Sequence, residues 1–340
     1  MSDIPWYGYV LEDGLIRALG AVERDLGAIS RASLIPEVRL SLQKQARRRS
    51  SRGSAGIEGV TLETAALQAI DRGLAPSSRN EREVAALMAL YDWVQEHSPG
   101  FVITEKDLRR IHQLVWDKII VKTMSGRYRR DAVGVWDGPR LVYEAPAAEK
   151  VPGLMAGFGE WLSGLGTSEL HPVLASGIAQ FQFIRIHPYM DGNGRCSRAL
   201  SALVLRCSGY DAGGLLAHED QILQRIDDFY EAIETSDRER DMTPWLRFYV
   251  TSLAEEVSAV LESVDSLNAQ EPGLRVRQLS LSSRQRLLLQ LLRTQPTLSP
   301  RDVPTIPRPS FYRDIQKLVD AGLVVARGEK RGRFYELASA

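Results

Sequence analysis

The sequence has little of what marks secreted or membrane proteins. Only two of its 340 residues are cysteines, Cys196 and Cys207, which argues against a disulfide framework and is typical of a reducing compartment. No early apolar run resembles a signal peptide, and no segment is long and apolar enough to span a bilayer. We therefore expect a cytoplasmic protein with no membrane partner.

The chain also lacks net charge, because its 43 lysines and arginines equal its 43 aspartates and glutamates. A neutral chain has no general attraction to nucleic acids or membranes. Basic residues gather locally, however, in 43–52 and around 327–333. The length suffices for two or three domains, and internal repeats and long low-complexity tracts are absent.

Most of the chain has the apolar spacing of amphipathic helices. Apolar residues recur three and four positions apart, so they line one face of a helix. Start signals support this interpretation, such as Thr104 followed by Asp107. The fold class expected is therefore mainly α, with helices at 11–29, 34–48, 81–94, 104–116, 172–186, 195–205 and 243–260.

The clearest departure from helix is the segment 133–146, VGVWDGPRLVYEAP. Two short β-prone runs flank Asp137-Gly138-Pro139, which predicts a β-hairpin. A lone hairpin is only marginally stable in water. We therefore expect it to lie on the helical body as a flap.

A second unit is expected after Asp265, where the composition changes and Glu271-Pro272-Gly273 is typical of a linker. Helices at 282–292 and 310–321, with a short helix and a turn within 298–306 between them, precede two strands at 323–327 and 333–337. Three helices and a two-stranded wing describe a winged helix-turn-helix. The expected organisation is an N-terminal helical region at 1–100, a helical core at 101–265, a linker at 266–280 and the winged helix at 281–340.

The partner of this winged helix stays open. Such domains most often place their second helix in the DNA major groove, and basic side chains neutralise phosphates. Asp314 and Asp320 dilute the positive charge, and many winged helices bind proteins or dimerise instead. The basic residues in question are Arg308, Arg313, Lys317, Lys330, Arg331 and Arg333.

The strongest functional signal is His187 to Arg198, which reads HPYMDGNGRCSR. We expect a loop that opens a second helix near Arg195, where free main-chain N–H groups and the helix dipole attract anions. Gly192 and Gly194 let the backbone approach phosphates without interference from a Cβ atom. The run therefore suits chemistry on a nucleoside triphosphate.

The charged side chains of this run complete the interpretation. Arg195 and Arg198 lie three apart on one helix face, so both can point at one polyphosphate. Asp191 offers the hard oxygen that Mg²⁺ prefers beside phosphate oxygens. His187 titrates near neutrality and can take a proton from an attacking hydroxyl.

The run resembles the signature of the Fic-domain family, His-Pro-Phe-x-Asp-Gly-Asn-Gly-Arg-x-x-Arg. Every specified position matches except Tyr189, where the family usually has Phe. The added hydroxyl needs a hydrogen-bond partner or water if it is buried. The resemblance extends roughly from the N-terminal helices to the helix after Thr243, and it implies a Fic-type helical core with the hairpin as its flap.

Fic proteins typically move AMP from ATP to a hydroxyl side chain of a target protein. The resemblance therefore implies that His187 is the general base for a Ser, Thr or Tyr hydroxyl. It implies that Asp191 holds Mg²⁺ on the α- and β-phosphates. The other implied contacts are an anion hole of Gly192, Asn193 and Gly194, Arg195 on the phosphates, Arg198 on the γ-phosphate, and Tyr230 beside the base.

The resemblance also implies how a target docks and how the enzyme is restrained. The flap strand at Leu141, Val142 and Tyr143 would pair with the main chain of the target segment. Ser54 to Gly59, SAGIEG, resembles the inhibitory motif of the family, in which Glu58 would pair with Arg198 and block the γ-phosphate. Ser54, Glu58 and Gly59 are therefore the expected regulatory residues.

Three glycines interrupt this inhibitory segment, namely Gly53, Gly56 and Gly59. Each disfavours helix by about 1 kcal/mol relative to Ala. We therefore expect a helix that holds mainly through docking and can release. In some relatives the glutamate also positions water to remove AMP, which is a further option for Glu58.

The function expected is Mg²⁺-dependent transfer of AMP from ATP to target proteins and to the protein itself. Transfer of GMP, UMP or a phosphoryl group is the alternative within the enzymes, although Gly194 favours AMP because phosphoryl-transferring relatives tend to carry Lys there. Outside the active enzymes, a nucleotide-sensing DNA-binding regulator and an inactive site both stay open. Tyr230 has an alternative as well, because it can be a core aromatic on the apolar face of a helix. The target protein and a homodimer are likewise open.

Overall fold

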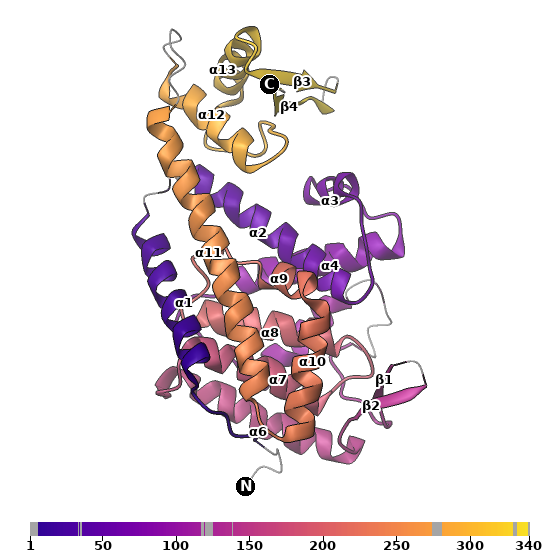
Figure 1. Ribbon diagram of the computed structural model, residues 1–340. Coiled ribbons are helices and arrows are strands. Elements are labelled where there is room, and N and C mark those ends of the chain that lie inside the picture. Colours follow the sequence, from indigo (N-terminus) through magenta and orange to yellow (C-terminus); the bar gives the residue numbers. More distant parts are fainter. Residues whose placement is uncertain are drawn as a thin grey trace. The chain divides into compact units, whose positions relative to one another are not determined.

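The structure is a computed structural model that describes residues 6–32, 34, 36–116, 119, 125–137, 139–273, 281–328 and 332–338. It is mainly helical, as expected, and two small antiparallel hairpins are the only sheets among the described residues (Figure 1). Within the same residues, none of the helices combines the length and the apolar character needed to cross a membrane.

The chain divides into two compact units. The first comprises the chain up to Ser30 together with Arg47–Val260, and the second comprises Arg31–Ala46 together with the chain from Leu261. Helices α1, α2 and α11 therefore contribute to both. The elements before the second unit's C-terminal part are α1 (Asp13–Arg31), α2 (Pro36–Ile57), α3 (Thr64–Asp71), α4 (Arg79–Gln95), α5 (Glu105–Val115), β1 (Gly134–Asp137), β2 (Arg140–Glu144), α6 (Val151–Gly164), α7 (Pro172–Ile186), α8 (Asn193–Cys207), α9 (His218–Gln224), α10 (Ile226–Glu239) and α11 (Thr243–Gly273).

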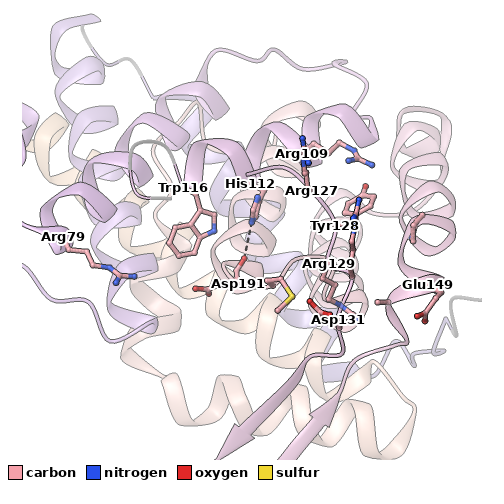
Figure 2. A pocket seen from close by; sticks show the side chains of 14 residues that line it. Arg79, Arg109, His112, Trp116, Arg127, Tyr128, Arg129, Asp131, Glu149 and Asp191 are labelled. Atoms are coloured by element: carbon pink, nitrogen blue, oxygen red, sulfur yellow. Dashed lines mark hydrogen bonds between the residues drawn. The ribbon is translucent and has the colours of Figure 1, made fainter. Parts of the chain in front are cut away.

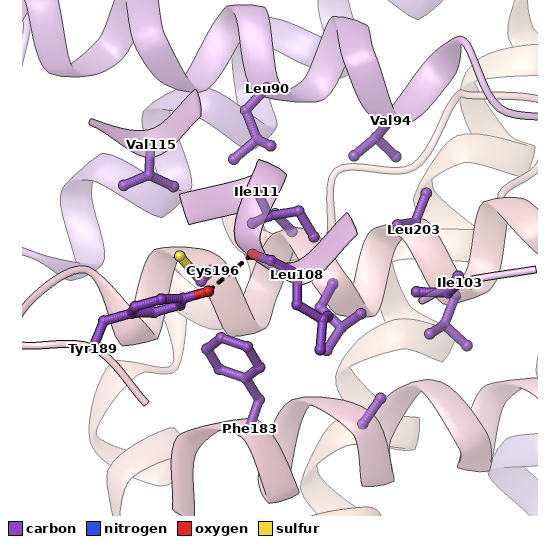
Figure 3. Close-up of a cluster of buried hydrophobic side chains, with 14 of the residues drawn as sticks. Leu90, Val94, Ile103, Leu108, Ile111, Val115, Phe183, Tyr189, Cys196 and Leu203 are labelled. Carbon is purple, nitrogen blue, oxygen red and sulfur yellow. Dashed lines mark hydrogen bonds between the residues drawn. The ribbon is translucent and has the colours of Figure 1, made fainter. Parts of the chain in front are cut away.

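Helix α7 is the centre of the first unit, with twelve of its fifteen residues buried. A helix that is apolar on every side must be surrounded by others. Helix α8 packs along it, and Gly177 admits α11, since a Cβ atom there would lie 2.8 Å from the Tyr249 ring. Figure 3 shows the other face, where Leu90 of α4 and Ile111 of α5 meet the side chains of α7 and α8.

The seven helices expected from apolar spacing all overlap observed helices, but α2 differs in extent. It runs unbroken to Ile57, through two of the three glycines that were expected to interrupt it. The reason is packing. A Cβ atom at Gly53 would lie 2.6 Å from the main chain of Glu219, and one at Gly56 would lie 2.7 Å from Leu223. The glycines thus let α2 seat closely against α9.

The predicted hairpin is present as β1 and β2. Gly134 pairs with Glu144, and the register shifts between Val135 and Trp136. Gly138 of the expected turn lies outside the described residues.

The second unit contains α12 (Ser283–Thr294), α13 (Arg308–Asp320), β3 (Val324–Arg327) and β4 (Phe334–Leu337). The prediction of a short helix within 298–306 is wrong, because the structure has two isolated turns there. In one turn the N–H of Asp302 donates to the carbonyl oxygen of Ser299, and in the other the N–H of Ile306 donates to that of Val303. Prolines at 300 and 304 remove main-chain donors that a helix would need. Leu298 instead pairs with Tyr335 of β4.

The expected linker also differs from what is observed. Helix α11 continues to Gly273, so 266–273 is helical, and 274–280 lies outside the described residues. Val257, Val260, Val264 and Leu267 are all buried at alternating three- and four-residue spacing, which sustains the helix past Asp265. Lys330 and Arg331 of the expected wing turn also lie outside the described residues.

Candidate active site

The motif loop joins α7 to α8 through two left-handed residues. His187 has φ 48° and closes α7 by donating its main-chain N–H to Phe183. Gly192 has φ 78°, and a Cβ atom there would lie 2.6 Å from Nε1 of Trp116. Both the backbone conformation and the close approach therefore require glycine at 192.

Asn193 holds the loop in shape. Its buried side chain accepts a hydrogen bond from the N–H of Tyr189 at 2.9 Å and donates one to the carbonyl oxygen of Tyr189 at 2.8 Å. The side chain is therefore committed to the loop. Only the main-chain N–H of Asn193, at the start of α8, can serve the expected anion hole.

Tyr189 is fully buried and its hydroxyl has a partner. The hydroxyl donates to the carbonyl oxygen of Leu108 at 3.2 Å (Figure 3), and the ring stacks on His112 with centroids 3.7 Å apart. The need for a partner, expected where Tyr replaces Phe, is thus met from α5.

His187 has one ring nitrogen occupied and one available. Nδ1 lies 3.2 Å from the carbonyl oxygen of Ile184. Because a carbonyl only accepts, Nδ1 carries the proton and Nε2 keeps its lone pair. Burial lowers the pKa of His187 below its ordinary value of 6.5, and the nearby Arg129 acts in the same direction. The ring is therefore neutral at pH 7 and can accept a proton.

Arg129 fixes the main chain around this histidine. It is buried, and its Nε donates to the carbonyl oxygen of His187 at 2.8 Å, while its other nitrogens donate to the carbonyls of Asp131 and Pro146. It ties the loop to the segments on either side of the hairpin. No spacing pattern in the sequence links Arg129 to the motif, so sequence reasoning missed it.

Arg198 is the most enclosed charge of the site, with 2% of its side chain exposed. Nε donates to Oγ of Ser54 at 3.1 Å, and Nη2 donates to the carbonyl oxygen of Ser54 at 3.0 Å and to Oε1 of Glu58 at 2.8 Å. The structure thus brings together the expected pair of Arg198 and Glu58. Gly59, with φ 77°, follows directly and turns the chain away after α2.

Glu58 also lies against the first turn of α8. A Cβ atom built on Gly194 would be 2.6 Å from Oε1 of Glu58. Burial opposes ionisation of Glu58, but the charge and hydrogen bond of Arg198 outweigh it and hold the carboxyl pKa below its ordinary 4.5. A carboxylate therefore occupies the N-terminal end of α8, where an anion is favoured.

Arg195 has a partner that the sequence did not reveal. Its Nη1 donates to Oε2 of Glu83 on α4 at 3.0 Å, and its guanidinium lies 4.5 Å above the Trp116 ring. Glu83 and Arg195 are both buried. The pairing joins residues 112 positions apart on separate helices, which no local pattern encodes.

Asp191 is the one acidic residue of the loop, and 70% of its side chain is exposed. One oxygen, Oδ1, accepts the N–H of Gly192 at 2.6 Å and lies 3.8 Å from Arg195. Oδ2 has no partner among the described residues. Those residues contain no cluster of three or more His, Cys, Asp or Glu side chains that could enclose a metal. A single carboxylate fits Mg²⁺ that takes its other ligands from phosphates and water.

The remaining predicted residues surround this centre. Tyr230 is 47% exposed, so it is not a core aromatic, and burial together with the charge of Glu58 raises the pKa of its hydroxyl. On the hairpin, Leu141 is exposed, Val142 is half-buried, and the hydroxyl of Tyr143 donates to the carbonyl oxygen of Arg185. Tyr143 thereby fastens β2 to α7.

Comparison with known proteins agrees with this arrangement. The Fic/DOC family model matches residues 102–205. Protein adenylyltransferase Fic of Drosophila yakuba is 26% identical over 262 residues, and that of Drosophila melanogaster is 27% identical over the same length. These matches cover 76% of this chain but only 48% and 49% of the relatives, so the chain spans about half their length.

Solved structures share the fold. A Fic family protein from Desulfovibrio desulfuricans superposes with a TM-score of 0.67 at 24% identity, covering 98% of both chains. Fic-1 from C. elegans superposes with a TM-score of 0.59 at 19% identity, covering 76% of this chain and 73% of its own. Residues 102–205 thus match the Fic/DOC family model, and the helical fold around them is shared with solved Fic family structures.

Proposed function

We propose that this protein transfers AMP from ATP to a Ser, Thr or Tyr hydroxyl of a target protein and of itself. The observation that carries the proposal is the position of a neutral His187, with Nε2 available, on the loop that opens α8. The names of the Drosophila relatives, protein adenylyltransferase, support the same activity.

The proposed reaction is a displacement at the α-phosphorus of ATP. Nε2 of His187 takes the proton of the acceptor hydroxyl, whose oxygen then bonds to the α-phosphorus. The bond from that phosphorus to the β-phosphate bridging oxygen breaks, and pyrophosphate leaves. The products are an AMP–protein ester and pyrophosphate.

Each neighbouring group has a proposed part in binding ATP. The first main-chain N–H groups of α8, at Asn193, Gly194 and Arg195, hold phosphate oxygens. Arg198 binds the γ-phosphate, and Tyr230 packs beside the base. Asp191 would hold Mg²⁺, which supplies charge neutralisation for the phosphates.

Glu58 is the proposed restraint on this activity. It takes the hydrogen bond from Arg198 that a γ-phosphate would take, and its carboxylate lies against Gly194 in the space of the anion hole. Two anions cannot share one arginine and one helix end without strong repulsion. ATP therefore cannot bind in the reactive position while Glu58 is paired with Arg198.

The test uses ATP labelled at either the α- or the γ-phosphate, with full-length protein and with His187→Ala. We expect covalent label on protein from the α-label only, and its loss in His187→Ala while ATP binding persists. Covalent label from the γ-phosphate would establish phosphoryl transfer instead. Tight ATP binding without covalent label would establish a nucleotide sensor, and near-normal transfer by His187→Ala would remove His187 from the role of base.

We also propose that α12, α13 and the β3–β4 hairpin form a winged helix. The hydrogen-bonded pairing of Leu298 with Tyr335 attaches the segment between the two helices to the hairpin, as a wing requires. Asp314 is buried and bound to Arg284, with Arg313 4.0 Å away, so its charge is already paired within this unit. Salt-dependent retention of the full chain on duplex DNA, lost in Arg308→Glu, would assign DNA as its partner, and no retention would assign protein contacts.

A further inference from the structure

A cavity of about 930 Å³ lies beside the motif loop (Figure 2). Met190 and Asp191 of the loop form one wall. The others come from the start of α4, from α5 and from the chain on both sides of the hairpin. Five arginines line the cavity, Arg79, Arg109, Arg127, Arg129 and Arg130.

Three of these arginines are already engaged. Arg79 pairs with Glu83 at 3.0 Å, and Arg109 pairs with Glu105 at 2.8 Å. Arg129 is buried and donates to main-chain carbonyls. These side chains already have partners within the protein and shape the cavity.

Arg127 and Arg130 are different. Both are exposed, and within the part of the chain that the structure describes neither makes a hydrogen bond or an ion pair. They stand three residues apart in a segment without regular secondary structure that leads toward β1. Two unpaired guanidinium groups at one cavity mark a site for carboxylates or phosphates.

The lining charge and the location distinguish between possible anions. Asp131, Glu149 and Asp191 line the same cavity, and they would repel a uniformly charged polymer such as a nucleic acid. An acidic peptide has charges only at chosen positions, with neutral main chain between them. The cavity also lies at the base of the hairpin, whose strand edges can pair with an extended peptide.

We infer that this cavity, the arginine cavity, binds an acidic segment of the protein that receives AMP. This inference rests on the proposed function and adds the chemistry of the target. Arg127 and Arg130 pair with Asp or Glu side chains near the acceptor residue. Because Asp191 borders the cavity, the acceptor hydroxyl of such a segment comes next to the loop that carries His187. The volume is in the range of ligand pockets, roughly 300–1,000 Å³, and admits several side chains.

The test measures binding first, so that it does not depend on catalysis. A fluorescent peptide with one Ser flanked by Glu residues is compared with the same peptide carrying Gln, by anisotropy with the full chain. We expect the Glu peptide to bind about tenfold more tightly than the Gln peptide at low salt, and this preference to disappear in Arg127→Glu/Arg130→Glu. Arg110→Glu, an exposed arginine of α5 outside the cavity, is the matched control and keeps the preference.

Three outcomes would overturn the inference. The first is equal binding of the Glu and Gln peptides. The second is a preference that survives both the double reversal and Arg127→Ala/Arg130→Ala. The third is a short oligonucleotide that binds more tightly than the Glu peptide through the same two arginines. Failure of the proposed function is separate, because it would appear as absence of covalent AMP on any protein, whatever the peptide binding shows.

Discussion

Removing the Glu58 carboxylate is the sharpest test of the restraint on Arg198. Glu58 lies just beyond the end of α2 at Ile57, so Glu58→Gly does not place a glycine inside a helix. The substitution removes one of the three hydrogen bonds of Arg198 and leaves the two to Ser54. It also clears the carboxylate from Gly194. We therefore expect higher AMP transfer without loss of fold.

The expected gain follows from the bond that is lost. A hydrogen bond to a charged group contributes about 1.5–3 kcal/mol. The Glu58 side chain is 30% exposed, so water screens its pair with Arg198, and we take the lower half of that energy range. At about 1.4 kcal/mol per factor of ten, the carboxylate opposes ATP on Arg198 by roughly 10- to 40-fold. Transfer should rise by the same factor when ATP is not saturating.

The assay is incorporation of α-labelled AMP, measured as kcat/KM for ATP with self-modification as readout. Glu58→Gln is the matched control, because it keeps the bulk beside Gly194 and removes only the charge. We expect a smaller gain from it than from Glu58→Gly. A folded Glu58→Gly protein with wild-type kcat/KM would refute the restraint, and equal gains from both variants would show that charge alone exerts it.

Three further outcomes are expected. Gly53→Ala should weaken the docking of α2 on the rigid main chain of Glu219, which lowers the free energy of unfolding by about 1–3 kcal/mol and raises AMP transfer. The control Gly20→Ala on α1, where a Cβ atom would meet nothing within 4 Å, should not destabilise the protein. Equal thermal stability of the two variants would contradict this prediction. Tyr189→Phe should cost about 1 kcal/mol in urea unfolding through its bond to Leu108 and leave transfer intact; loss of transfer would give the hydroxyl a catalytic part. The pKa of Glu58 is lowered in the folded protein, so its stabilising pair with Arg198 is present above the ordinary carboxyl pKa of 4.5 and is lost only as the pH falls below that value. The activity ratio of Glu58→Gly to wild type should therefore stay constant between pH 8 and about pH 5.5. A ratio that collapses near pH 6 would point to another titrating group.

The sequence predicted the elements of the site better than their contacts. Apolar spacing located the long helices, and the motif located the loop between α7 and α8, because both signals are local. Asn193 shows the limit. Its expected place in an anion hole stays a prediction that rests on its main-chain N–H. Only the structure shows that its side chain braces Tyr189, because the loop must satisfy its buried main-chain groups.

The glycines of α2 show a second limit. Helix propensity treats Gly53 and Gly56 as weaknesses, whereas close packing against α9 makes them requirements. Propensity describes an isolated helix, and the missing Cβ atoms acquire their meaning only when another helix lies against them.

By itself the sequence determined which chemical groups this protein has for the proposed reaction and in what order, because the motif is one continuous stretch of chain. Only the tertiary structure decided which groups are free to act. It assigns Arg195 to Glu83, Arg198 to Ser54 and Glu58, and leaves Arg127 and Arg130 without partners among the described residues. Those pairings join helices 100 or more residues apart, and the competition for each buried charge is settled by packing rather than by spacing along the chain.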